Sequence, residues 1–158
     1  MRIGFGYDVH RLRPGRKCIL CGVEIPSDFG PDGHSDADVP VHALIDAMLG
    51  AAALGDIGKH FPDTDDRYKD ANSIELLKKT YNLVLLHGYC LGNADITIVI
   101  QSPRISPYVK QMRSKIADAI FTDIENISVK ATTEEGMGIT GDSSGISAYA
   151  VVLLIPAT

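Results

Sequence analysis

The sequence has few cysteines, and they do not form the pattern of a structural site. Cys18, Cys21 and Cys90 are an odd number in a chain whose first residues contain no apolar signal region, which argues against a disulfide framework. Cys18 and Cys21 have the spacing of half a zinc knuckle, but no second C-x-x-C follows. The run KCILCGVEI resembles a strand, in which residues three apart point to opposite faces. We therefore expect buried free thiols.

The chain also lacks a long apolar segment and a run of basic residues. Its longest apolar run, AVVLLI at 150–155, is far too short to cross a bilayer. The formal net charge is -5, whereas proteins that bind nucleic acids display clustered lysine and arginine. We expect a cytoplasmic protein that contacts neither a nucleic acid nor a membrane. Any phosphate that it binds must be held by metals, backbone amides or a few isolated cations.

The composition is that of an ordinary globular domain. Hydrophobic residues make up 45% of the chain and charged residues 22%, and no segment is biased enough in proline, serine or charge to indicate disorder. With 158 residues, the chain can form one domain that buries roughly two-thirds of the surface exposed by its unfolded form. We expect a single catalytic domain over residues 1–158, without a linker.

Hydrophobic periodicity predicts a mixed α/β fold of the α+β kind. Apolar residues recur at helical spacing from Val39 to Leu49, with Asp38 as the expected N-cap and Pro40 in the first turn. Two further helices are expected at about 71–87 and 107–121. Strands are expected at about 3–10, 17–26, 94–102, 127–133 and 146–156, with a glycine-rich loop before the last one. The pattern predicts a single mixed sheet with helices packed on one face.

The second face of this sheet is expected to be buried as well. The strands ITIVI at 96–100 and AVVLLI at 150–155 are apolar at odd and even positions alike, which is typical of strands buried on both sides. Three helices of this length can cover only one face. We therefore expect the other face to pack against copies of the chain in a homo-oligomer.

The opening strand has two different faces. One is wholly apolar and is expected to lie in a core: Ile3, Phe5, Tyr7 and Val9. The other places an acid and an imidazole side by side, after two residues without side chains: Gly4, Gly6, Asp8 and His10. Such a pair can provide two ligands of a metal ion, although an ion pair at a strand end has the same sequence.

His42 is the candidate third ligand, because it stands off the apolar stripe near the start of its helix. Asp46 lies one turn further along on the same face. A metal-bound imidazole usually donates its other N–H to a carboxylate, so Asp46 has the spacing of a residue that orients His42. Asp8, His10 and His42 would leave zinc one open position, as in catalytic sites. The alternative is an exposed helix pair of little energetic consequence.

Two loops contain further candidates. The loop GKHFPDTDDRYKD lacks the glycine and the closing glutamate of an EF-hand, so we reject calcium. Its acids either form a solvated surface or accept hydrogen bonds from substrate hydroxyls: Asp56, Asp63, Asp65 and Asp66. The run Gly136-x-Gly138-x-x-Gly141 is not a dinucleotide fingerprint, because a strand follows it instead of a helix. The residues 132–135 just before it place hydroxyls beside a carboxylate, which suits a magnesium-phosphate group or a plain polar turn.

Three blocks of the sequence carry a resemblance to a known family: GYDVHRL, HSDADVPVHALIDAMLGAAALGDIGKHFPDTD and VKATTEEGMGITG. In this order they resemble the 2-C-methyl-D-erythritol 2,4-cyclodiphosphate synthase family of the non-mevalonate isoprenoid route, over essentially the whole chain. The resemblance implies a phosphorus-oxygen lyase that acts as a homotrimer, with active sites between subunits. Its implied substrate, 4-diphosphocytidyl-2-C-methyl-D-erythritol 2-phosphate, attacks its own β-phosphorus with its 2-phosphate and releases CMP.

The resemblance also assigns the metal ligands and catalytic residues. Asp8, His10 and His42 match the zinc ligands of the family, and Glu135 matches the ligand of a second divalent ion, magnesium or manganese, bound with the substrate phosphates. The implied catalytic residues are His34, Asp56 and Thr133.

Substrate contacts are implied along the same three blocks. Those near the metals and phosphates match Asp8, Val9, His10, His34, Ser35, Thr133, Glu134 and Glu135. The pocket for the methylerythritol part matches Asp56, Ile57, Gly58, Phe61, Pro62, Asp63, Thr64 and Asp65. The cytidine pocket, contributed by a neighbouring subunit, matches Ile100, Gln101, Ser102, Pro103, Arg104, Ile105, Ser106, Ala131 and Thr132.

The sequence departs from the family pattern at three positions. Ile139 and Asp142 stand where many members place an aromatic residue and an arginine in a central cavity associated with isoprenoid diphosphates, and an aspartate repels a diphosphate. Arg104 stands where lysine is frequent. Two other functions fit the bare residues: a zinc phosphohydrolase that uses water as nucleophile, and a non-catalytic oligomeric binding protein.

Overall fold

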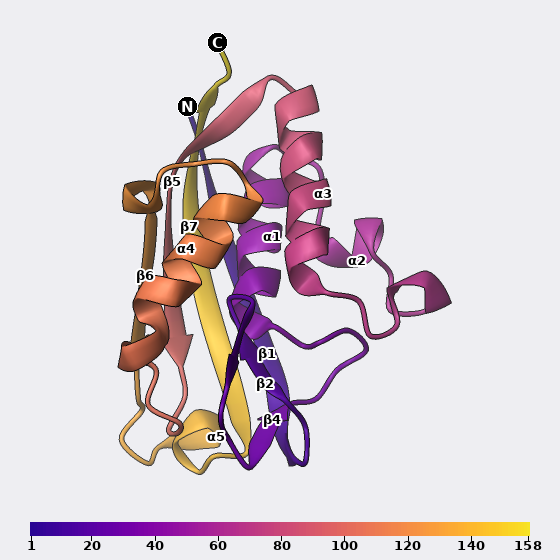
Figure 1. Cartoon of the computed structure of the whole chain (residues 1–158). Helices are drawn as coiled ribbons and strands as arrows, with labels where there is room; N and C mark the ends of the chain where they lie inside the picture. The colour runs from indigo at the N-terminus through magenta and orange to yellow at the C-terminus, as the bar shows by residue number, and fades with distance from the viewer.

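The computed structural model describes residues 1–158 as one mixed sheet with helices on one side (Figure 1). The sheet has the order β4-β1-β7-β5-β6, in which only β5 and β6 run parallel. Its strands are β1 (Arg2–Pro14), β4 (Phe29–Pro31), β5 (Tyr89–Val99), β6 (Ile127–Thr132) and β7 (Gly145–Pro156). The helices are α1 (Val39–Ala51), α2 (Ile57–His60), α3 (Ser73–Leu86), α4 (Val109–Ala119) and α5 (Gly138–Gly141). The predicted fold class is confirmed.

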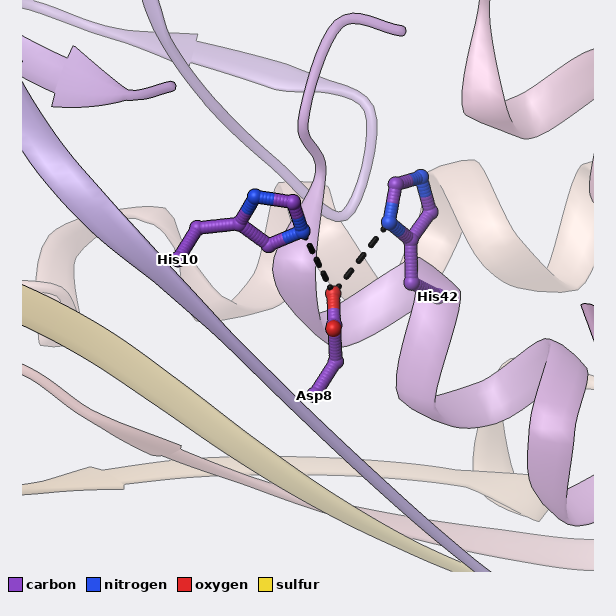
Figure 2. A group of neighbouring side chains, drawn as sticks. All are labelled: Asp8, His10 and His42. Carbon is purple, nitrogen blue, oxygen red and sulfur yellow. Dashed lines mark hydrogen bonds and ion pairs between the residues drawn. The ribbon is translucent and has the colours of Figure 1, made fainter. Parts of the chain in front are cut away.

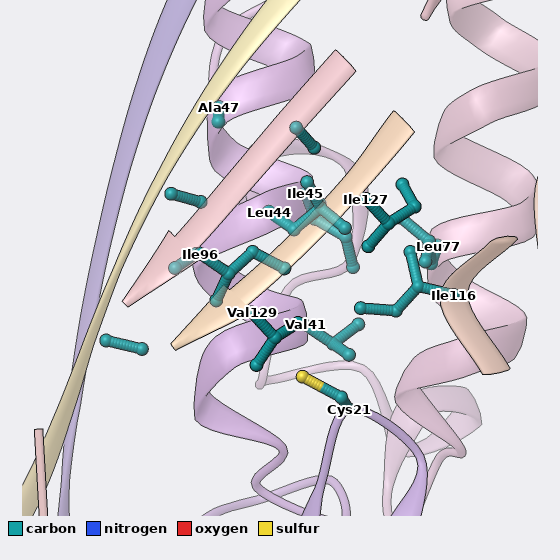
Figure 3. Packing of buried hydrophobic residues seen from close by; sticks show 14 of the residues in the cluster. Cys21, Val41, Leu44, Ile45, Ala47, Leu77, Ile96, Ile116, Ile127 and Val129 are labelled. Atoms are coloured by element: carbon teal, nitrogen blue, oxygen red, sulfur yellow. The ribbon is translucent and has the colours of Figure 1, made fainter. Parts of the chain in front are cut away.

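The helix α1 is the centre of the core. It is buried almost all round, because it lies on β1 and β7 and is covered in turn by α3. Figure 3 shows Leu44 and Ile45 of α1 packed among side chains from β5, β6, α3 and α4. None of the helices combines the length and the apolarity that a membrane span requires.

Two glycines of β1 allow α1 to lie directly on the strand. A Cβ atom at Gly4 would come 1.8 Å from the carbonyl oxygen of Ala47, and one at Gly6 would come 1.9 Å from that of Ala43. Both distances are far below van der Waals contact, so any side chain here would push the helix away. The pair of glycines in the opening strand therefore serves close packing of backbone on backbone.

The apolar face of β1 is exposed in the single chain. The expectation that it lies in a core is therefore wrong for the core of one subunit. Ile3 is 74% exposed, and the exposure falls along the strand to 40% at Val9. Tyr149 and Val151 of β7 continue the same surface. The strands β5 and β7 likewise alternate between buried and partly exposed positions, so in one chain the helices cover only one face of the sheet.

The expected strand at 17–26 is a hairpin instead, formed by β2 (Cys18–Leu20) and β3 (Val23–Ile25). Cys21 and Gly22 turn the chain with φ values of 50° and 73°, a conformation that glycine favours. The turn is held by Asp38, the predicted N-cap of α1, whose carboxylate accepts hydrogen bonds from the N–H groups of Cys21, Gly22 and Val41. Burial raises the pKa of Asp38 to about 7, although two of these N–H groups oppose the shift. Cys18 and Cys21 are buried free thiols, as predicted.

Other differences concern boundaries and short elements. Strand β5 begins at Tyr89, five residues earlier than expected, and α4 begins at Val109 after a 3-10 turn at Ser106–Tyr108. Further 3-10 turns lie at Asp66–Tyr68 and Ile124–Asn126. The four-residue helices α2 and α5 lie in segments expected to be loops, where glycines obscure the periodicity.

We predict opposite effects of alanine at two glycines of this packing unit. Gly6→Ala should lower the free energy of unfolding by more than about 3 kcal/mol, because the new methyl group overlaps the backbone of α1. Gly50→Ala should raise it by about 0.5–1 kcal/mol, because Gly50 lies in α1 with open space around it. Urea denaturation of both variants at one protein concentration tests this, and equal stability of the two would contradict the proposed role of Gly6.

Candidate metal centre and substrate pockets

The structure brings together the three side chains that the sequence suggested as metal ligands. Oδ2 of Asp8 lies 3.1 Å from Nε2 of His10 and 3.2 Å from Nδ1 of His42. Figure 2 shows the two imidazoles on either side of the carboxylate, with Asp8 and His10 on β1 and His42 on α1. One ligand atom from each residue lies within 4.8 Å of the other two. A carboxylate oxygen and two imidazole nitrogens are a donor set that fits zinc and leaves a position open.

This geometry follows from the packing of α1 on β1. The period of two in the strand places Asp8 and His10 on the same face as Gly6, and the helix that rests on this glycine carries His42. Gly33 completes the arrangement, because a Cβ atom there would come 2.9 Å from Cε1 of His10. The site therefore requires glycine at two places, Gly6 beneath α1 and Gly33 beside His10.

The charges of the three groups are coupled. Burial alone would raise the pKa of Asp8, but its contacts with His10 and His42 outweigh this effect and lower that pKa below its ordinary value. The hydrogen bond to Asp8 raises the pKa of His10, against the opposing effect of its burial. Nδ1 of His10 also lies 2.6 Å from the carbonyl oxygen of Asp32. A metal ion at this position would therefore replace a proton shared within the group.

Asp46 does not orient His42 in the structure, in contrast to the expectation from their spacing. Its Oδ1 accepts a hydrogen bond of 2.7 Å from the N–H of Ile57, at the start of α2, and no hydrogen bond joins it to His42. Burial raises the pKa of Asp46. Nε2 of His42 instead faces the hydroxyl groups of Ser73 at 2.8 Å and Ser35 at 3.2 Å.

A cavity of about 320 Å³ opens in front of the triad. It includes most of the residues expected near the phosphates and the methylerythritol part: Asp8, His10, His34, Ser35, His42, Ile57, Gly58, Phe61, Pro62 and Asp63. Tyr68 and Leu76 also line it, and neither was expected there. Leu76 has the apolar spacing of ordinary helix packing, and Tyr68 lies in a loop whose acids alone suggested a site. Seven expected residues do not line it: Val9, Asp56, Thr64, Asp65, Thr133, Glu134 and Glu135.

The carboxylates of Asp56 and Asp65 have hydrogen-bond partners in their own loop. Asp56 caps α2 through the N–H of Lys59 at 2.9 Å. Asp65 accepts hydrogen bonds from Nε and Nη2 of Arg67, and this pairing lowers the pKa of Asp65. Both carboxylates therefore shape the loop that borders the cavity.

A second cavity, of about 490 Å³, lies at the ends of β5 and β6. It is lined by nearly all the residues expected in the cytidine pocket: Ile100, Gln101, Pro103, Arg104, Ile105, Ser106, Ala131 and Thr132, with Thr133 beside them. Ser102 is the exception, and Val109 and Lys130 are additions. The two cavities share no lining residue, so one chain separates the metal triad from this pocket.

The loop after β6 is exposed and differs in the roles of its two glutamates. Glu134 accepts a hydrogen bond from the buried hydroxyl of Thr140 in α5. Glu135 has a φ of 53°, in the left-handed region, and its N–H donates to Oγ1 of Thr133 at 3.3 Å. Glu134 is thus tied to the protein, whereas the carboxylate of Glu135 is free to bind a cation.

Comparison with known proteins agrees with this geometry. The model of the YgbB family matches residues 1–155. The chain is 62% identical to 2-C-methyl-D-erythritol 2,4-cyclodiphosphate synthase of Moorella thermoacetica and 58% identical to that of Clostridioides difficile, over 98% of its length and 95% and 96% of theirs. The solved structure of Plasmodium falciparum IspF in complex with CDP is 34% identical, with a TM-score of 0.88 over 99% of this chain and 97% of that one. The chain therefore belongs to the YgbB family, together with these cyclodiphosphate synthases.

Proposed function

We propose that the protein converts 4-diphosphocytidyl-2-C-methyl-D-erythritol 2-phosphate to 2-C-methyl-D-erythritol 2,4-cyclodiphosphate and CMP. The observation that carries this proposal is the triad Asp8, His10 and His42 at the wall of a cavity, in a chain with cyclodiphosphate synthases as relatives. The proposed reaction is intramolecular: an oxygen of the 2-phosphate attacks the β-phosphorus, and the bond to the CMP oxygen breaks. No side-chain nucleophile is needed.

The main barrier is the approach of two anionic phosphates. The first cavity of one chain is lined by no lysine or arginine, so its lining offers no permanent positive charge to offset the phosphates. We assign zinc to Asp8, His10 and His42, and magnesium or manganese to Glu135 with the substrate phosphates. When bound, these ions would offset phosphate charge and polarise the phosphoryl oxygens.

The protein residues position the substrate. His34 and Ser35 lie in the same cavity as the triad, where they can donate hydrogen bonds to a phosphate. Ile57, Phe61 and Leu76 supply apolar surface for the methylerythritol part in that cavity. Holding a folded-back substrate near its attack geometry removes much of the entropic cost of ring closure.

We further propose that the active enzyme is a homotrimer in which the second cavity of one copy meets the triad of the next. The supporting observation is the exposed apolar surface of β1 and β7, which comprises Ile3, Phe5, Tyr7, Val9, Tyr149 and Val151. Two of its rings, Tyr7 and Tyr149, already pack together with centroids 5.1 Å apart. A continuous apolar surface of this kind is typical of a subunit interface. The cytidine part of the substrate would bind in the second cavity.

The reaction can be followed by phosphorus NMR with the diphosphocytidyl substrate and magnesium. We expect a cyclic diphosphate to appear together with CMP, and His42→Ala to slow its formation by about a thousandfold or more, since metals supply several kcal/mol of transition-state stabilisation. His87→Ala, on the exposed end of α3, is the matched control and should retain activity. Linear phosphates instead of the cyclic product would indicate a phosphohydrolase, and absence of any product from a folded, zinc-loaded protein would leave a binding protein.

Metal affinity should rise as the pH increases through the raised pKa of His10. Because Asp8 raises the pKa of His10 in the metal-free protein, a proton must leave before this imidazole can act as a ligand. The population of the proton-free ligand, and with it the apparent zinc affinity, therefore falls as the pH drops below that raised pKa. Calorimetry in buffers of different ionisation enthalpy measures the protons released, and a pH-independent zinc affinity would contradict the assignment of His10.

A charge on the apolar surface should separate the subunits. Phe5→Glu introduces a carboxylate into the proposed interface, so we expect dissociation to monomers and loss of activity. Phe121→Glu is the control, because Phe121 is 94% exposed at the end of α4 and lies outside this surface. Sedimentation velocity distinguishes the outcomes, and a Phe5→Glu protein that remains a trimer of normal stability would contradict the proposed interface.

A further inference from the structure

The buried side of His42 contains a chain of three hydrogen-bonding residues. Nε2 of His42 lies 2.8 Å from Oγ of Ser73, and Ser73 is completely buried at the first position of α3. The hydroxyl of Ser73 donates in turn to Oδ1 of Asp36, and the backbone N–H of Ser73 donates to Oδ2 of the same carboxylate at 3.0 Å. The carboxylate of Asp36 is thus held against Ser73 by two hydrogen bonds.

The number of available protons determines which group donates in each hydrogen bond between His42, Ser73 and Asp36. A serine hydroxyl has one proton, and the carboxylate of Asp36 can only accept, so the proton of Ser73 points to Asp36. The oxygen of Ser73 must then accept from His42, which requires a proton on Nε2. A neutral imidazole has one N–H, so Nδ1 of His42 retains a lone pair. That nitrogen is the one that faces Asp8.

His10 is fixed in the opposite sense by the same principle. Its Nδ1 lies 2.6 Å from the carbonyl oxygen of Asp32, which can only accept. The proton of neutral His10 is therefore on Nδ1, and the lone pair on Nε2 points to Asp8. His10 thus presents Nε2 and His42 presents Nδ1 toward Asp8. In each ring the other nitrogen faces an acceptor, the carbonyl oxygen of Asp32 or the hydroxyl of Ser73.

Ser35 is the competing partner of His42. Its oxygen lies 3.2 Å from Nε2 of His42 and accepts from the N–H of Ala37 at 3.1 Å. The hydroxyl proton of Ser35 is not used by that contact, so it can donate to Nε2 and favour a proton on Nδ1. Without a bound metal, the carboxylate of Asp8 at 3.2 Å from Nδ1 favours the same Nδ1–H form. Ser73 opposes this form only while its own proton is donated to Asp36.

We propose that Asp36 and Ser73 are positioning residues that fix His42 in the tautomer that can bind a metal through Nδ1. The inference rests on the metal role given above to Asp8, His10 and His42. It assigns to a serine at the start of α3 and an aspartate just before α1 the function that spacing along α1 suggested for Asp46. Partners of this kind typically change metal affinity by 10- to 100-fold.

The first test uses the metal-free Asp8→Ala protein, because the carboxylate of Asp8 would otherwise compete for a proton on Nδ1 of His42. Long-range proton–nitrogen NMR at a pH at which His42 is neutral shows which ring nitrogen carries the proton. We expect the proton on Nε2 of His42 and on Nδ1 of His10, and adding Ser73→Ala should move the His42 proton toward Nδ1. A proton on Nδ1 of His42 in the Asp8→Ala protein that retains Ser73 would overturn the proposal.

The second test compares zinc affinity, measured by competition with a chromophoric chelator, in two pairs of variants. Ser73→Ala and Asp36→Asn should bind zinc about 10- to 100-fold more weakly than the unaltered protein. Asp46→Asn and Ser114→Ala, the latter on α4, are matched controls that should bind zinc within about threefold of the unaltered protein. A folded Ser73→Ala protein with unchanged zinc affinity would overturn the proposal, as would a loss confined to Asp46→Asn.

These readouts also separate this inference from the proposed reaction. Tight zinc binding with the Nε2–H tautomer but no cyclic diphosphate would contradict the reaction and support the role of Ser73. Full formation of the cyclic product by a protein with the Nδ1–H tautomer would do the reverse.

Discussion

The close contact of helix α1 with strand β1 is the constraint on which the rest of the structure depends. It is possible only because Gly4 and Gly6 leave the surface of the strand open to the carbonyl oxygens of the helix. The same contact places His42 within hydrogen-bonding distance of Asp8, so the packing of the core also determines the geometry of the site. A side chain at either glycine would therefore change the distance between ligands before it changed the chemistry of any of them. Asp38 adds to this by joining the start of α1 to the β2–β3 turn.

The two faces of strand β1 carry different kinds of residue. One face carries the glycines and the two metal-binding side chains, and the other carries a row of exposed apolar residues from Ile3 to Val9. Because neighbouring residues in a strand point in opposite directions, the exposed apolar row on one face and the ligand pair Asp8 and His10 on the other are fixed relative to each other to within a residue. A shift of register by one position would exchange the two surfaces.

The sequence was sufficient for the fold class, the three long helices and the grouping of Asp8, His10 and His42, because each rests on a local period or on a resemblance of long blocks. It failed where the decisive neighbour is distant in the chain. The apolar face of β1 looks like a core face from its pattern alone, and only the placement of α1 on the glycine face shows otherwise. Asp46 was expected beside His42 because the two share a helix face, whereas the structure turns it to Ile57 and brings in Ser73 from 31 residues away. The hairpin turn at Cys21 was missed because a cysteine at positive φ has no signature in its letters.

The distribution of the triad over β1 and α1 has a consequence for folding thermodynamics. Asp8 and His42 are separated by 34 residues, so the donor set exists only after the helix has docked on the strand. An ion that binds this set binds the native chain and not the unfolded one, and it shifts the folding equilibrium by mass action. At a free concentration of a hundred times its dissociation constant, such an ion adds about 2.7 kcal/mol to the stability of the native state. Zinc supply and protein lifetime would thereby be linked in the cell, independently of any turnover.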